Sequence, residues 1–159
     1  MATKEQYAFF RALYDEEEHT YDQLEARARL YLTIISLFLA ALLLKADEAK
    51  RSAEALGLPW FLLTTVALLL AGALLLVVIA MRIRTYEGPA DPQAIIEGFA
   101  DEPPTDDTFL DERIVDLAVA TNRNSVANNK TATTLQYASY CLVLAMFILL
   151  VGIAYGFRS

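Results

Sequence analysis

The sequence predicts an all-α membrane protein with three transmembrane helices, of which the first and third extend into a cytoplasmic helical stalk. The chain of 159 residues is 56% hydrophobic and only 21% charged. Its apolar residues are gathered into three blocks rather than spread at the spacing of a soluble helix or strand, which is typical of an integral membrane protein. The six Gly and five Pro are too few for a fibrous or low-complexity chain.

Residues 1–29 are predicted to form a cytoplasmic helix. No Gly or Pro interrupts residues 3–29, and Thr3 with Gln6 has the form of a capping box. Large residues then recur at alternating steps of three and four, the spacing of a heptad seam. We call this pattern the N-terminal seam, and it comprises Tyr7, Phe10, Tyr14, Glu17, Tyr21, Leu24, Ala28 and Tyr31. The seam leads without a helix breaker into the first span.

The first span is predicted at residues 30–45. Its apolar block, Leu30 to Leu44, covers only about 22 Å at ~1.5 Å per residue, less than the ~30 Å of the hydrocarbon layer. The span can be lengthened by the flanking Arg27, Arg29 and Lys45, because long basic side chains reach from the apolar region to the lipid headgroups.

Residues 46–56 are good helix formers, so we expect the first helix to continue through them, within a short non-cytoplasmic helical loop at 46–57. Gly57 and Pro59 should end that helix. The second span is predicted at residues 58–81, and its length exceeds the ~20 residues needed to cross a bilayer.

Residues 82–134 are predicted to return to the cytoplasm. They contain an acidic, Pro-containing loop at 87–107 and a helix at 106–134, for which Thr105 or Asp106 is the expected N-cap. This helix continues into the third span at 135–157. A second pattern of steps of three and four runs along it. This C-terminal seam comprises Ile114, Leu117, Thr121, Asn124, Asn128, Thr131, Leu135, Ala138 and Leu142.

Three crossings place the N-terminus and residues 82–134 on one side of the membrane and the C-terminus on the other. Six basic residues lie near span ends on the first side and four on the second. By the positive-inside rule, the first side is therefore predicted to be cytoplasmic.

The centre of the C-terminal seam is polar, and two interpretations of it stay open. Buried Asn124 and Asn128 can fix register and oligomeric state, or they can line a polar pocket or pore that binds a small ligand through amide hydrogen bonds. Lys130 can supply charge to a phosphate or anchor the helix at the headgroups. In the acidic run at 15–18, Glu17 alone lies on a seam, where it can face Asn124, Asn128 or Arg123 of a neighbouring helix or provide charge at a pore mouth.

Composition and motifs exclude several other classes. A net charge of -7 argues against nucleic-acid binding, and one Cys with one His argues against a metal site. No GxSxG, Walker loop, GxGxxG or HExxH motif is present, so we expect no enzyme, no catalytic residue and no cofactor. The spans contain no ionisable residue at mid-depth, which argues against a proton relay.

An acidic, Tyr-containing helix enters the first span through Leu24-Glu25-Ala26-Arg27-Ala28. A later helix reads Leu117-Ala118-Val119-Ala120-Thr121-Asn122-Arg123-Asn124 and then Asn128-Asn129-Lys130. From about Tyr14 onward the chain resembles the small transmembrane effectors of bacterial anti-phage nucleotide signalling, the Pycsar transmembrane effector group and the related SLATT-type modules. The family pattern has Lys where this chain has Arg27, and the loop at 87–107 is an insertion relative to it.

The resemblance implies a homo-oligomer in the bacterial inner membrane that is activated by a cyclic nucleotide, with a cyclic pyrimidine nucleotide expected, from a partner cyclase. Activation would disrupt or perforate the lipid bilayer and arrest growth. The matching candidate ligand residues are Arg27, Asn124, Asn128 and Lys130. The alternative function is a membrane scaffold or accessory subunit that recruits a cytosolic partner through its helical stalk.

Overall fold

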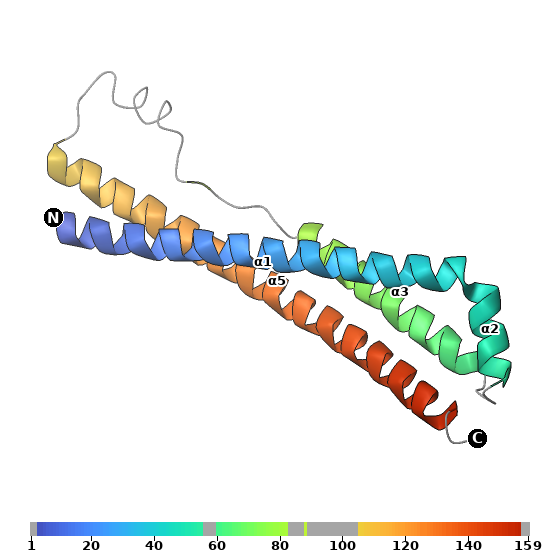
Figure 1. Ribbon diagram of the computed structural model, residues 1–159. Coiled ribbons are helices and arrows are strands. Elements are labelled where there is room, and N and C mark those ends of the chain that lie inside the picture. The colour runs from blue at the N-terminus through green and yellow to red at the C-terminus, as the bar shows by residue number, and fades with distance from the viewer. Residues whose placement is uncertain (1–2, 56–59, 83–87, 89–104, 157–159) are drawn as a thin grey trace. The chain divides into compact units, whose positions relative to one another are not determined.

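The computed structural model describes residues 3–55, 60–82, 88 and 105–156. These residues form four helices, shown in Figure 1. They are α1 (Lys4–Leu44), α2 (Ala46–Ala55), α3 (Trp60–Arg82) and α5 (Asp106–Gly156). The acidic loop predicted at 87–107 lies almost entirely outside the described residues.

Three of these helices, α1, α3 and α5, are long and apolar enough to cross a membrane. α1 has 41 residues and α5 has 51. At ~1.5 Å per residue, α5 measures about 76 Å and α1 about 61 Å, whereas the hydrocarbon layer is ~30 Å thick. Each of these two helices therefore has about half its length or more to spare beyond a membrane crossing.

Side-chain caps fix where α1 and α5 begin. The amide of Gln6 donates to Thr3 Oγ1 (3.2 Å) and the amide of Thr3 donates to Gln6 Oε1 (2.9 Å), which confirms the predicted capping box. For α5 the amide of Thr108 donates to Thr105 Oγ1 (3.4 Å), so Thr105 rather than Asp106 is the N-cap. Both caps satisfy amides that have no partner inside the helix.

Thr3→Ala is expected to fray the first turn of α1, because it removes one of the two reciprocal cap hydrogen bonds at a cost of about 0.5–2 kcal/mol. Hydrogen exchange at the amide of Gln6 should become several-fold faster, while exchange in the middle of α1 stays unchanged. Thr3→Ser keeps the hydroxyl and serves as the control. Equal exchange in all three proteins would show that the cap does not hold this end.

The expectation of one helix from the first span through residues 46–56 is wrong, because α1 ends at Leu44 and α2 begins at Ala46. The residue at the break, Lys45, donates from Nζ to both carboxylate oxygens of Glu48 (2.8 and 2.9 Å). Asp47 and Glu48 occupy the first turn of α2, where acidic side chains favour a new helix start because they interact well with the helix dipole. The charged helix α2 therefore starts separately from the apolar end of α1.

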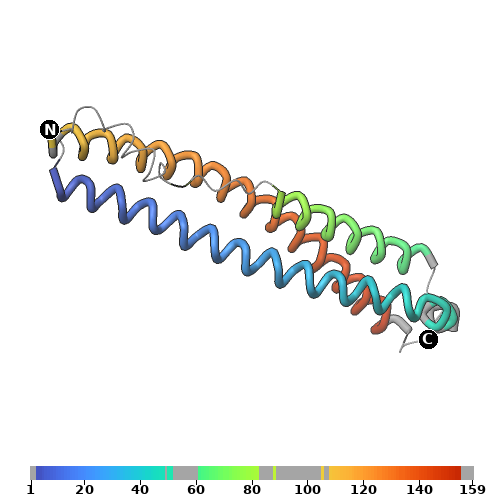
Figure 2. The backbone as a smooth tube through the Cα atoms, turned by 90° about the horizontal axis from the view of Figure 1, so that it is seen from above, coloured from blue at the N-terminus to red at the C-terminus, as the bar shows by residue number. Residues whose placement is uncertain are grey.

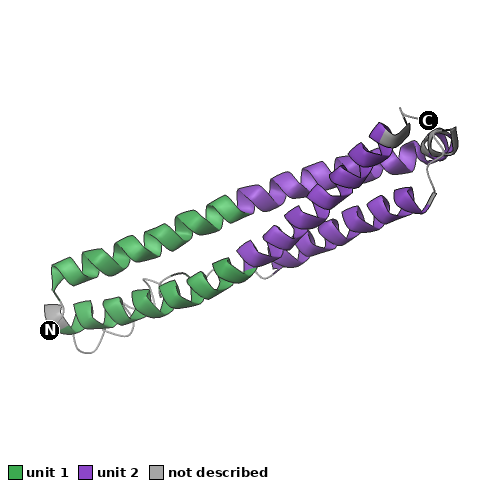
Figure 3. Cartoon of the chain, turned by 90° about the horizontal axis from the view of Figure 1, so that it is seen from below, with its two compact units in different colours: residues 1–24, 84–130 green, residues 25–83, 131–159 purple. Residues whose placement is uncertain are grey.

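The chain divides into two compact units, coloured in Figure 3. Unit 1 comprises residues 1–24 and 84–130, and unit 2 comprises residues 25–83 and 131–159. α1 and α5 each contribute their first part to unit 1 and the remainder to unit 2. No helix break separates the two parts of either helix.

In unit 2, α3 runs antiparallel to the second part of α1, and α5 runs in the direction of α1 (Figure 2). This alternation is the one that three crossings require. Among the described residues of unit 2, the interior consists of aliphatic and small side chains with one buried polar residue, Thr131. The buried apolar residues are Ala28, Ile35, Val66, Leu70, Ala73, Val77, Ala80, Leu135, Ala138 and Ala145.

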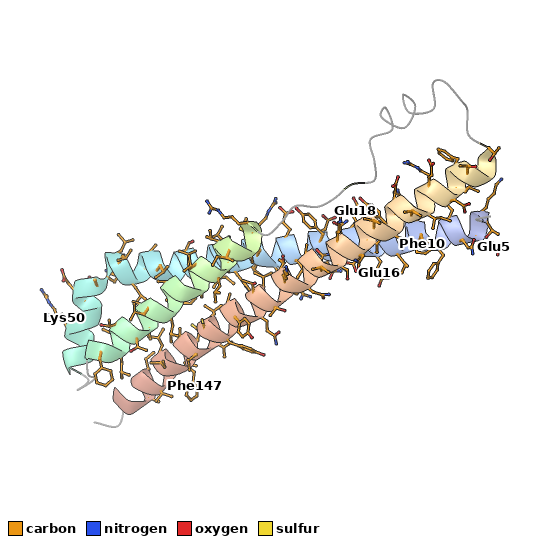
Figure 4. The ribbon with its side chains drawn as sticks, turned by 180° about the vertical axis from the view of Figure 1, so that it is seen from behind. Glu5, Phe10, Glu16, Glu18, Lys50 and Phe147 are labelled. Atoms are coloured by element: carbon orange, nitrogen blue, oxygen red, sulfur yellow. The ribbon has the colours of Figure 1, made fainter. Side chains whose placement is uncertain are left out.

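The outward faces of these helices carry large apolar side chains, such as Leu37, Leu68 and Phe147, which are 69%, 68% and 61% exposed. Phe147 is labelled in Figure 4. Exposing such faces to water would cost ~25 cal/mol per Å² of apolar surface. In a bilayer the same faces contact hydrocarbon, and this cost is absent. The exposure pattern is that of a multi-pass membrane protein.

Candidate functional site

The candidate site is the buried seam between α1 and α5 in unit 1. The two helices run parallel there, shown in green in Figure 3. Every position of the N-terminal and C-terminal seams that belongs to unit 1 is buried or half-buried. The spacing of three and four therefore identifies the faces that turn inward, because a helix advances 3.6 residues per turn.

An aromatic cluster closes the N-terminal end of this seam. Tyr14, Leu117 and Ala120 are 4%, 3% and 5% exposed and pack together, with Tyr7 and Phe10 against them. The Arg11 guanidinium carbon lies 5.5 Å from the centre of the Tyr14 ring, within range of a cation–π interaction. Ala120 leaves room for the Tyr14 ring on the facing helix, so a large and a small residue complement each other.

Beyond the cluster the seam becomes polar, and the side-chain amide of Asn128 joins the two helices. Asn128 Nδ2 donates to the backbone carbonyl of Glu17 (3.0 Å) and to Glu17 Oε2 (2.8 Å). Asn128 is 5% exposed and Glu17 is half-buried. A hydrogen bond to a carboxylate in such surroundings is stronger than one between neutral groups. The contact is one of the three that the seam position of Glu17 predicts.

Asn124 and Thr121 extend the polar seam toward the aromatic cluster. Asn124 is 1% exposed and lies one turn before Asn128. The hydroxyl Oγ1 of Thr121 is buried and has no hydrogen-bond partner among the described residues. An unsatisfied buried polar atom costs about 1–3 kcal/mol. A ligand or water that bonded to Thr121 would therefore recover free energy.

The remaining predicted ligand residues are exposed. Arg27 lies on the part of α1 that belongs to unit 2, and Lys130 is the last residue of unit 1. The structure thus brings together Glu17 and Asn128 directly and places Asn124 on the same buried face of α5. The predicted ligand set is divided between a buried amide pair and two exposed cations.

The rest of the acidic run forms a solvated face. Asp15, Glu16 and Glu18 are exposed, and the latter two are labelled in Figure 4. Asp15 Oδ1 accepts from Arg11 Nε at 3.0 Å, one turn earlier on α1. Glu17 is accordingly the member of the run whose carboxylate contacts the seam.

Sequence reasoning missed Arg113, which lies near the start of the C-terminal seam. Its side chain is 16% exposed, pairs with Asp116 (2.8 Å) and lies over the ring of Phe109 (5.8 Å to its centre). Its Nε is buried without a hydrogen-bond partner among the described residues. The spacing Arg-x-x-Asp on one helix face was the available signal, since residues three apart are neighbours.

In the described part of the chain, no three His, Cys, Asp or Glu side chains lie close enough together to hold a metal ion. The single histidine, His19, has Nε2 at 2.9 Å from Nε2 of Gln23 and is exposed. Comparison of the chain with protein-family models, curated proteins and solved structures gives no match.

Proposed function

We propose that the protein is a homo-oligomeric inner-membrane effector of anti-phage defence, whose cytoplasmic helices receive a nucleotide signal and whose spans then disrupt the membrane. The observation that supports this most is that the helices α1 and α5, joined by the Glu17–Asn128 contact in unit 1, each continue unbroken into a membrane-length apolar segment.

Helix continuity gives the proposed signal a physical route. Helices kink sharply at Pro, at Gly pairs or at local insertions. α1 contains no Gly or Pro, and α5 contains none before Gly152. A shift or rotation of α1 or α5 at the seam would therefore be transmitted along the same helix to its membrane-spanning part. Switching requires an element with two discrete packings, and a seam with a polar centre between apolar ends suits that role.

The proposed ligand is a cyclic pyrimidine nucleotide, and the polar seam has the donors to bind one. The amide of Asn128 can exchange its Glu17 acceptor for an oxygen of the base. Asn124 offers a second amide and Thr121 a hydroxyl with unused hydrogen-bonding capacity. Lys130 would supply the charge for the phosphate. Loss of the Glu17–Asn128 contact would then release the two helices from each other at the polar part of the seam, while the aromatic cluster keeps them paired at its other end.

Membrane disruption in this proposal needs more than one copy of the chain. Among the described residues of unit 2, those that are buried are apolar apart from Thr131, so this part of a single copy contains no polar path. Several copies would have to assemble or distort the lipid together. The same apolar interior favours a second candidate function, a membrane scaffold that recruits a cytosolic partner through unit 1 without opening a path.

Dye-filled liposomes containing the purified full-length protein distinguish the two functions. With cyclic CMP or cyclic UMP we expect dye release, and with cyclic AMP release should remain at the level of the protein alone. Asn124→Leu should lower the response because it replaces a buried amide of the seam, and Glu18→Gln on the solvated face should not. Intact liposomes at saturating nucleotide would reject the effector and leave the scaffold.

A further inference from the structure

A second stripe with seam spacing lies on the outside of α5 in unit 1. This outer stripe comprises Val115, Val119, Asn122 and Val126, again at steps of four, three and four. Each member precedes a C-terminal seam residue by two positions. Two residues turn a helix by about 200°, so the outer stripe lies on the opposite face from the buried seam.

The outer stripe is apolar where a water-facing surface is expected to be polar. Val115, Val119 and Val126 are 59%, 44% and 48% exposed, and Asn122 is exposed between them. A single exposed valine is ordinary, but three β-branched residues in one row with seam spacing are the pattern of a helix-packing face. Among the described residues, α1 packs on the buried seam and the outer stripe faces away from it, where it could pack against another helix.

We propose that the outer stripe packs against the outer stripe of a second copy of this chain, as a parallel and in-register helix pair. This inference rests on the proposed function. It identifies a surface through which the copies of the proposed homo-oligomer contact each other. Two copies inserted in one membrane have α5 pointing the same way, so a two-fold axis sets each stripe residue opposite its own counterpart.

Asn122 is the residue that selects a second copy over other occupants. In a parallel in-register pair the two Asn122 amides face each other, and each can donate and accept, so neither is left unsatisfied. A polar residue within an apolar seam fixes register at some cost in stability. On one side the stripe is flanked by Ala118 and Ser125, whose short side chains let a second backbone approach.

A lipid surface fits the outer stripe less well. Helices that lie on membranes have Lys and Arg along the borders of the apolar face. The border residues in the first turns here include Asp111, Glu112 and Asp116, which anionic headgroups would repel. Lipid also offers the Asn122 amide no matched partner.

Cysteine cross-linking of the full-length protein in native membranes tests the contact. Cys141 is first replaced by Ala, and then Val119→Cys, Asn122→Cys or Val126→Cys is introduced singly. A disulfide requires Cα atoms within about 7 Å, so all three variants should give a dimer under mild oxidation. Ala12→Cys, exposed on α1 of the same unit, is the matched control and should give none.

Val119→Asp adds a measurement independent of cross-linking. It places two like charges opposite each other in the pair and should weaken self-association of the detergent-solubilised protein about tenfold or more. Ala12→Asp should not change the association constant, and circular dichroism checks that both variants stay helical.

Three outcomes would overturn the inference: equal cross-linking at Ala12 and the stripe, disulfides formed only with another protein or not at all, or unchanged association in Val119→Asp. The nucleotide-dependent dye release stays a separate readout. Stripe dimers without dye release would refute the effector while leaving the contact intact. Dye release without stripe dimers would refute the contact while leaving the effector.

Discussion

Replacing Tyr14 by Ala should separate α1 from α5 in unit 1, with the largest loss of stability of any single substitution outside the spans. Tyr14 is 4% exposed and packs on Leu117 and Ala120. Truncating a buried aromatic residue costs about 3–5 kcal/mol, because apolar contacts are lost and a cavity remains. Hydrogen exchange of residues 4–24 in nanodiscs should accelerate about 100-fold or more, since each ~1.4 kcal/mol is a factor of ten.

Phe9→Ala is the matched control for this expectation. It deletes a ring of similar size that is 60% exposed and touches the edge of Phe10. Surface substitutions usually change stability by less than about 0.5 kcal/mol. Similar acceleration in both variants would mean that the aromatic cluster does not hold the helix pair together.

The second large effect is expected at the Glu17–Asn128 contact. Asn128→Ala removes the donor of both hydrogen bonds, so the half-buried carboxylate of Glu17 loses its partner. The free energy of unfolding of the helix pair should fall by about 1.5–3 kcal/mol. Glu17→Ala removes only the carboxylate acceptor and keeps the backbone carbonyl, so its cost should be smaller. Glu18→Ala, on the solvated face, should be close to neutral.

A double-mutant cycle isolates the contact itself. The protection of residues 4–24 is measured for the parent, the two single variants and the Glu17→Ala, Asn128→Ala double variant. Residues in one hydrogen-bond network show coupling of about 0.5–3 kcal/mol, so the double variant should lose less than the sum of the single losses. Additive losses would show that the two side chains do not interact energetically.

The two effects differ in what they mean for signalling. The aromatic cluster is an apolar contact that a polar ligand cannot replace, so Tyr14 would hold the two helices together in both states. The Glu17–Asn128 contact is polar, so it could be replaced by a ligand that accepts from the Asn128 amide while water solvates the released Glu17 carboxylate. In the proposed mechanism the switch would therefore lie at the polar part of the seam and its anchor at Tyr14.

Periodicity in the sequence was sufficient to identify the three long helices and their inward faces. The three long apolar helices, the capping box at Thr3 and the burial of Tyr14, Leu117 and Asn124 all follow from local rules. These features depend on residues within a few turns of each other, so a single chain segment contains the information.

Only the tertiary structure decided which residues meet across the seam. The sequence offered Asn124, Asn128 and Arg123 as neighbours of Glu17, and the hydrogen bonds join Glu17 to Asn128. It also left open whether Thr105 or Asp106 caps α5, and it predicted a continuous helix where Lys45 separates α1 from α2. A pattern that repeats every seven residues fixes the face of a helix but not its axial register, because sliding by one heptad preserves the pattern. The register is set by the shapes of particular facing side chains, such as Tyr14 against Ala120, and these meet only in the folded chain.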